Sequence, residues 1–113
     1  MLTVEALKKL GVDTADGLGR GLNNESFYLR LVAKCMQDEH FDLLEAAVGQ
    51  KQLKDAFEYA HSLKGVVGNL SLTPLYEPIV EITELLRVGT DTDYSGYLEK
   101  IRTARNAIVA LSA

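Results

Sequence analysis

A histidine, a lysine and two glycines within one predicted helix are the residues in this sequence best suited to chemistry. Apolar residues recur there at intervals of three and four, which predicts an amphipathic helix over residues 51–70. At about 100° per residue, Gly65 and Gly68 fall on the face that displays His61, and Lys64 follows within one turn. Glycine inside a helix costs about 1 kcal/mol relative to alanine. Two glycines there indicate a ring left bare for another molecule's surface.

This arrangement suits a ring nitrogen that attacks or holds an anionic group. Neutral imidazole is a good nucleophile at cytosolic pH, because its unperturbed pKa is about 6.5. The ammonium group of Lys64 would neutralise an anion held at the ring of His61. Phosphoryl transfer needs in-line geometry and charge neutralisation more than covalent help from the protein, so a phosphoryl group fits this site.

Four apolar stripes of similar length, joined by short connections, must position these residues. They predict an all-α fold, an antiparallel four-helix bundle with short additional N-terminal helices packed across it. The predicted bundle helices span residues 39–49, 51–70, 74–88 and 94–111. We expect residues 1–113 to form a single domain.

Capping residues define two helices ahead of the bundle. Thr3 is suited to cap a helix over residues 2–10, and Gly11 to end it. Asn24 is suited to cap a helix over residues 25–37. The apolar stripe of this second helix is predicted at Phe27, Leu31 and Cys35, flanked by Tyr28 and Val32.

Glycines and a proline mark the expected irregularities. The alternation of Gly17, Gly19 and Gly21 fails both the GxGxxG and the P-loop spacing, so we interpret it as a flexible turn between short helices. Gly49 is the expected C-cap of the first bundle helix. Pro78 lies past the first turn of its helix, where its missing N–H predicts a kink or an irregular first turn.

A short run of the chain closely resembles the signature of histidine-containing phosphotransfer (HPt) domains of two-component phosphorelays. The run is Ala60-His61-x-Leu63-Lys64-Gly65-x-x-Gly68. The resemblance extends more weakly from Gly17-Leu18-x-Arg20 to the final helix. It implies that His61 is the phosphorylated nucleophile, through Nε2, and that Lys64 stabilises the charge of the phosphate.

The resemblance implies a phosphorelay intermediate. His61 would accept a phosphoryl group from a phospho-aspartyl receiver domain and pass it to another receiver. The expected partners are response-regulator receiver domains, a hybrid histidine kinase, or both. The receiver would bring Mg²⁺, so the domain needs no cofactor of its own. We expect a phosphoryl carrier without independent catalytic turnover, and therefore not an enzyme.

The same resemblance assigns a docking surface around the histidine. Gly65 and Gly68 would let the active-site loops of the receiver approach, and Phe57 and Val66 would belong to the apolar part of the surface.

In that family a Gln or Glu on the following helix holds the other ring nitrogen, which fixes the tautomer. The aligned position here is Thr83, with Glu84 beside it, and these two are the candidate ring-orienting partners. Threonine is shorter, so we expect a water or Glu84 to replace its direct contact. The family also usually carries glycine where this chain has Ser71.

Composition excludes several other classes of function. A net charge of −4 and a pI near 5.1 argue against nucleic-acid binding, which needs a basic face. No apolar run reaches the roughly 18 residues of a membrane span, and no signal peptide is evident. Cys35 is the only cysteine, so no internal disulfide can form. We expect a cytoplasmic monomer without membrane contact.

Two alternative functions and one alternative site remain. The chain could be a helical protein-interaction bundle that is never phosphorylated, or an HPt-type substrate domain cut from a larger histidine kinase. His40, His61 and Cys35 lie on separate predicted helices without paired spacing, so no metal site is expected. His40 is expected in solvent, and Cys35 in the core.

Overall fold

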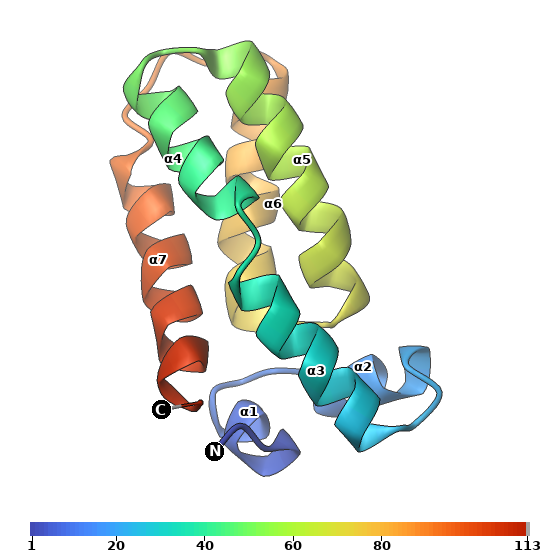
Figure 1. Cartoon of the computed structure of the whole chain (residues 1–113). Helices are drawn as coiled ribbons and strands as arrows, with labels where there is room; N and C mark the ends of the chain where they lie inside the picture. Colours follow the sequence, from blue (N-terminus) through green and yellow to red (C-terminus); the bar gives the residue numbers. More distant parts are fainter. Residues whose placement is uncertain (113) are drawn as a thin grey trace.

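The computed structural model describes residues 1–112, and every regular element within them is an α-helix (Figure 1). The predicted all-α class is therefore confirmed. In chain order the helices are α1 (Val4–Lys9), α2 (Thr14–Arg20), α3 (Glu25–Met36), α4 (His40–Gly49), α5 (Leu53–Asn69), α6 (Thr73–Arg87) and α7 (Ser95–Ala110). None of these helices combines the length and the apolar character that crossing a membrane requires.

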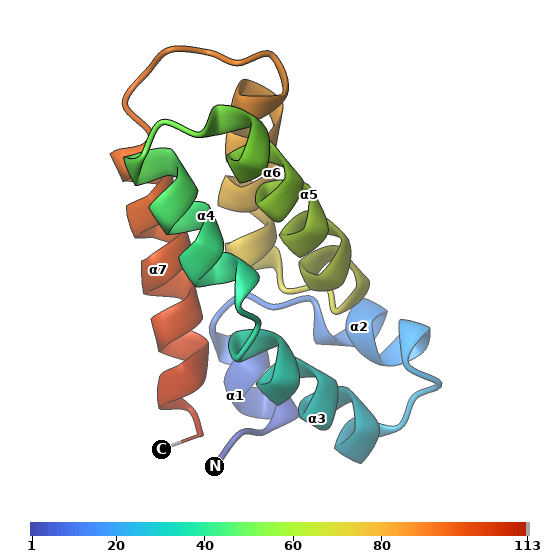
Figure 2. The ribbon, with the colours of Figure 1, turned by 45° about the horizontal axis from the view of Figure 1, so that its top comes forward.

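The last four helices form the expected antiparallel bundle. Helix α4 packs on α5, α5 on α6 and α6 on α7. An ion pair between Glu45 of α4 and Arg102 of α7 joins the first of these helices to the last. Their ends lie within two residues of the predicted bounds. Figures 1 and 2 show α1, α2 and α3 gathered at one end of the bundle, where α5 finishes and α6 begins.

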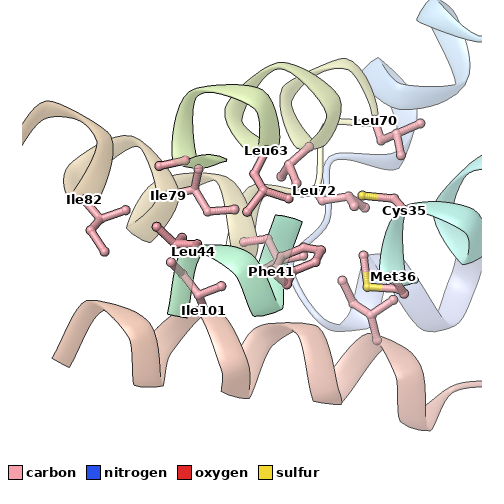
Figure 3. Close-up of a cluster of buried hydrophobic side chains, with 14 of the residues drawn as sticks. Cys35, Met36, Phe41, Leu44, Leu63, Leu70, Leu72, Ile79, Ile82 and Ile101 are labelled. Atoms are coloured by element: carbon pink, nitrogen blue, oxygen red, sulfur yellow. The ribbon is translucent and has the colours of Figure 1, made fainter. Parts of the chain in front are cut away.

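The interior of the bundle is apolar and draws on all four of its helices. Figure 3 shows Leu44, Leu63, Ile79 and Ile101 directed into this common interior, and all four are buried. Each such side chain contributes about 1.5–3 kcal/mol relative to exposure. Thr83 is also fully buried, and its hydroxyl donates a hydrogen bond to the Ile79 carbonyl at 2.6 Å. This packing decides which face of α5 is left outside.

Helix α5 ends at Asn69, and two residues later Ser71 lies in the left-handed region, with φ of 55°. The N–H of Leu72 bonds to the Val67 carbonyl at 3.2 Å, and the N–H of Ser71 to the Gly68 carbonyl at 3.1 Å. This pair of bonds is a Schellman motif, in which glycine usually takes the left-handed position. A non-glycine residue there costs about 1–2 kcal/mol. The hydrogen bond from the Ser71 hydroxyl to Asp16 of α2 offsets part of that cost.

Two further helix ends test the cap predictions. Gly11, with φ of 95°, ends α1 as predicted. The prediction for Gly49 is wrong, because Gly49 is the last residue of α4 itself. Lys51, with φ of 57°, takes the left-handed position instead, and its N–H bonds to the Val48 carbonyl at 3.1 Å.

The N-terminal segment is more ordered than the sequence predicts. The expected flexible turn is helix α2, and a Cβ added to its Gly17 would lie 2.7 Å from the Tyr28 ring. Glycine is therefore needed at this close contact between α2 and α3. The buried face of α3 is also rotated from the prediction: Tyr28 and Val32 are fully buried, whereas Phe27 is 39% exposed.

Helix α6 runs without a break through Pro78, which is buried. In its first turn the Leu72 carbonyl accepts hydrogen bonds from the N–H groups of both Leu75 and Tyr76, each at 2.9 Å. Shared hydrogen bonds of this kind are common at helix ends and do not involve Pro78, so the predicted irregularity at Pro78 is not confirmed. Pro74 lies in the same turn, where a missing N–H costs nothing.

Candidate functional site

Helix α5 has a buried face and an exposed face, and His61 lies on the exposed one. The buried face consists of Ala56, Ala60, Leu63 and Val67. Because these small and branched side chains are turned into the bundle, the periodicity of α5 keeps the imidazole outside it. The ring is open to an approaching molecule, as its setting in the sequence predicts.

The ring of His61 stacks on Phe57, which lies one turn earlier on α5. The two ring centroids are 5.7 Å apart and the ring planes differ by 22°. The guanidinium carbon of Arg87, at the end of α6, lies 5.1 Å from the centroid of the Phe57 ring. Nε of Arg87 also donates to Oε2 of Glu84 at 3.3 Å. The sequence alone does not predict that Arg87 lies at this site, because only the packing of α6 on α5 brings it to this face.

Lys64 and Gly65 complete the open face next to the histidine. The Lys64 side chain is partly exposed and forms no ion pair within residues 1–112. A Cβ built on Gly65 would meet no heavy atom within 4 Å. The chain itself therefore gives no packing reason for glycine at this exposed position.

Gly68 differs from Gly65, because packing inside the chain requires it to be small. A Cβ at Gly68 would lie 2.9 Å from Cε1 of Tyr76, on α6. Its lack of a side chain allows the Tyr76 ring to lie against α5. The two glycines predicted to serve one purpose thus have separate physical settings.

A cleft of about 410 Å³ opens beside this face, toward the N-terminal helices. Its lining includes Lys64, Gly65 and Gly68 of α5 together with Asp13, Asp16 and Arg20 from the α2 segment. Hydrogen bonds from Ser71 and then Arg20, the latter at 2.9 Å, lower the pKa of the Asp16 carboxyl. The bond to Asp16 holds Arg20 in the lining of the cleft.

The predicted docking surface needs one correction. Phe57 and Val66 are nine residues apart, which places them about 180° apart around a helix. Val66 is 37% exposed and lines a separate groove of about 570 Å³ between α3 and α5, with Leu31 and Leu70. Phe57 lies beside His61 and Val66 does not, so the two do not form one patch.

Within residues 1–112, neither candidate ring-orienting residue forms a hydrogen bond with the imidazole. The Thr83 hydroxyl is fully buried and donates to its own helix, so it does not hold the exposed ring of His61. Glu84 is exposed and accepts a hydrogen bond from Arg87 instead. A threonine on a helix facing the core bonds readily to the carbonyl four residues earlier.

The other reactive side chains lie away from this face. His40 is half-buried rather than solvated, and its Nδ1 lies 2.6 Å from Oδ1 of Asp38. Burial opposes ionisation of Asp38, but hydrogen bonds from His40 outweigh it and lower the pKa of the carboxyl. Burial also raises the pKa of the Cys35 thiol to about 12, which makes it a poor nucleophile. Residues 1–112 contain no cluster of metal-binding side chains.

The family model described as Hpt domain matches residues 35–112. The chain belongs to the Hpt domain family. The matched residues include helices α4 to α7. Helices α1 and α2 and most of α3 lie before the matched residues. No curated protein and no solved structure matches the chain. Membership assigns the Hpt domain to phosphotransfer in two-component signalling, in which such domains are phosphocarriers rather than catalysts.

Proposed function

We propose that this Hpt domain accepts a phosphoryl group on Nε2 of His61 from the phospho-aspartate of a receiver domain, and passes it to another receiver. The observation that supports the proposal is the exposed imidazole of α5, with open space at Gly65 and an ammonium without an ion pair at Lys64 within residues 1–112. The fold leaves all three groups accessible from one side.

The transfer balances without help from another side chain of this domain. The Nε2 lone pair attacks phosphorus, the bond between phosphorus and the aspartyl oxygen breaks, and the receiver's carboxylate leaves. Nδ1 keeps its proton, so no general base is required. Lys64 would offset the charge of the phosphate on His61, and Mg²⁺ would come with the receiver, whose own site needs it.

Labelled receivers from the same genome test the proposal directly. Wild-type protein should take up an acid-labile, alkali-stable phosphate from at least one phosphorylated receiver, and His61→Gln should take up none. His40→Gln is the matched control, since the chain has two histidines. His40→Gln should be labelled normally. Label on His61→Gln, or no label on the wild-type protein from any receiver, would refute the proposal.

One result would redirect the proposal to the kinase-substrate alternative. If His61 is labelled by a histidine kinase with ATP but exchanges phosphate with no receiver, the domain is a kinase substrate and the relay role is wrong.

A further inference from the structure

The orientation of the His61 ring needs an explanation, because the imidazole is exposed and has no hydrogen-bond partner within residues 1–112. The two candidate partners form other hydrogen bonds: the Thr83 hydroxyl donates to the Ile79 carbonyl, and Oε2 of Glu84 accepts from Arg87. An exposed ring held only by its own torsions would rotate about its Cβ–Cγ bond. An attack in line with the aspartyl phosphate requires a restricted ring.

The contact that restricts the ring is the stack on Phe57. Residues four apart on a helix are neighbours, and the 5.7 Å separation with a 22° interplanar angle is an offset-stacked geometry. Such a stack fixes the plane of the imidazole. It does not distinguish Nδ1 from Nε2, because a half-turn of the ring preserves the stack. Phe57 therefore restricts the ring to two orientations within one plane.

Phe57 is itself held by helix α6. Its side chain is partly buried against the core, and the Arg87 guanidinium lies over its ring at 5.1 Å. This distance is within the range of a cation–π contact. Arg87 is in turn oriented by Glu84. The contacts run from α6 through Phe57 to the imidazole.

We propose that Phe57, held in place by Arg87, is a positioning residue that fixes the plane of the His61 ring for phosphoryl transfer. The inference rests on the proposed function for its kinetic consequence, whereas the stack can be tested without a partner. In this role Phe57 acts through the ring of His61, and not on the phosphoryl group itself.

Ring-current shifts in NMR spectra measure the stack. In Phe57→Leu the Hδ2 and Hε1 signals of His61 should move toward the values of an unstacked histidine, and in Phe57→Tyr they should stay near the wild-type values. The chain offers a matched control, because Tyr59 lies 5.9 Å from His40 at a tilted angle. Tyr59→Leu should move the signals of His40 and leave those of His61 in place. Unmoved His61 signals in Phe57→Leu would overturn the proposal.

Kinetics then test positioning. With a receiver that labels the wild-type protein, Phe57→Leu should slow transfer about fivefold, which is the rate equivalent of one lost stacking contact. Phe57→Tyr keeps the aromatic ring and should transfer at the wild-type rate. Phosphoramidate, a small donor that can approach from any direction, should label both variants within about twofold of wild type. Far-ultraviolet circular dichroism is the control for folding, and each variant should give the helical spectrum of the wild-type protein.

The possible failures are distinct. If wild type is labelled and Phe57→Leu is labelled at the same rate, the positioning role is wrong while the proposed function stands. Another outcome is that the His61 signals move in Phe57→Leu while no receiver labels the wild-type protein. In that case the stack is confirmed, but the proposed function and the positioning role are both wrong.

Discussion

At Gly65 a side chain would project into open space, whereas at Gly68 it would meet the ring of Tyr76. Sequence spacing treats the two glycines alike, but their surroundings differ. Gly68 is explained by packing within the chain. Gly65 has no such explanation, so its cost in helix propensity indicates a requirement outside folding.

We therefore predict that Gly65→Ala is more stable than wild type by about 1 kcal/mol, because alanine favours the helix and meets no neighbour. The free energy of unfolding from urea titration measures this. A loss of stability would show that Gly65 has a structural role after all.

A longer side chain at the same place should separate stability from transfer. Gly65→Gln should remain as stable as wild type or exceed it, yet transfer from a receiver should slow at least about tenfold, because the side chain stands between the two surfaces. Gly96→Gln is the control of equal size. A Cβ at Gly96 would also meet no heavy atom within 4 Å, and Gly96 lies on a different helix, α7. Equal transfer rates in both variants would remove Gly65 from the interface.

Lys64 can be tested in the same way, because no ion pair within residues 1–112 depends on it. Lys64→Ala should change stability by less than about 0.5 kcal/mol, as at other surface positions. It should shorten the lifetime of phosphohistidine or slow transfer about threefold to tenfold, since a charge near the phosphate is lost. Lys54→Ala, an exposed lysine earlier on α5, is the comparison. Identical kinetics for both would exclude Lys64 from the site.

At the scale of elements, three hydrogen bonds within residues 1–112 join the end of α5 to the N-terminal segment, one of them from the Asp13 N–H to the Ser71 carbonyl at 3.3 Å. The buried hydroxyl of Tyr28, on α3, donates to the Leu70 carbonyl at 2.8 Å. The Ser71 hydroxyl bonds to Asp16, on α2. The left-handed Ser71 thus turns the chain toward α6 and also contacts the α2 segment, which contributes to the lining of the cleft.

Tyr28→Phe should lower the free energy of unfolding by about 1–3 kcal/mol, because it leaves the Leu70 carbonyl without its partner while keeping the ring. Gly17→Ala should cost about 1–3 kcal/mol by a different cause, since its Cβ would press on the anchored Tyr28 ring. Urea titration of both single variants and the double variant tests the shared contact. The double variant should lose less than the sum, because a ring without its hydroxyl anchor can move away from the added Cβ. Strictly additive losses would contradict this coupling.

Periodicity was sufficient to predict the four bundle helices, because four long apolar stripes leave little choice of register. It failed on α3, where Phe27 and Tyr28 are adjacent and both aromatic, so only tertiary packing decides which one is buried. The exposed place of His61 followed from the wheel. The contacts of Thr83 and Arg87 did not, since they depend on how α6 is rotated against α5.

At the scale of the whole molecule, the N-terminal helices lie at only one end of the bundle, next to the cleft. The family match begins at residue 35, and the helices before it gather at the end of α5 that carries Gly68 and the cleft. Two ionisable groups, Tyr28 and Cys35, are buried near this junction. We therefore expect the attachment of the N-terminal helices to weaken at alkaline pH.

Burial raises the pKa of Tyr28 from 10.0 to about 12, and that of Cys35 from 9.0 to about 12. Both groups therefore keep their protons to higher pH in the folded protein than in the unfolded chain. Their contribution to stability is complete below about pH 9 and is lost as the pH rises toward 12. Each group that ionises only in the unfolded chain lowers the free energy of unfolding by about 1.4 kcal/mol per pH unit.

We predict that the free energy of unfolding falls between about pH 9 and about pH 11, and that single substitutions divide this slope. Cys35→Ala should remove the part that begins near pH 9, and Tyr28→Phe the part that begins near pH 10. Urea titrations across this range measure both slopes, and comparison with wild type cancels the lysines and exposed tyrosines. Slopes unchanged in both variants would mean that neither group is protected from ionisation by the fold, and that the junction opens readily to water.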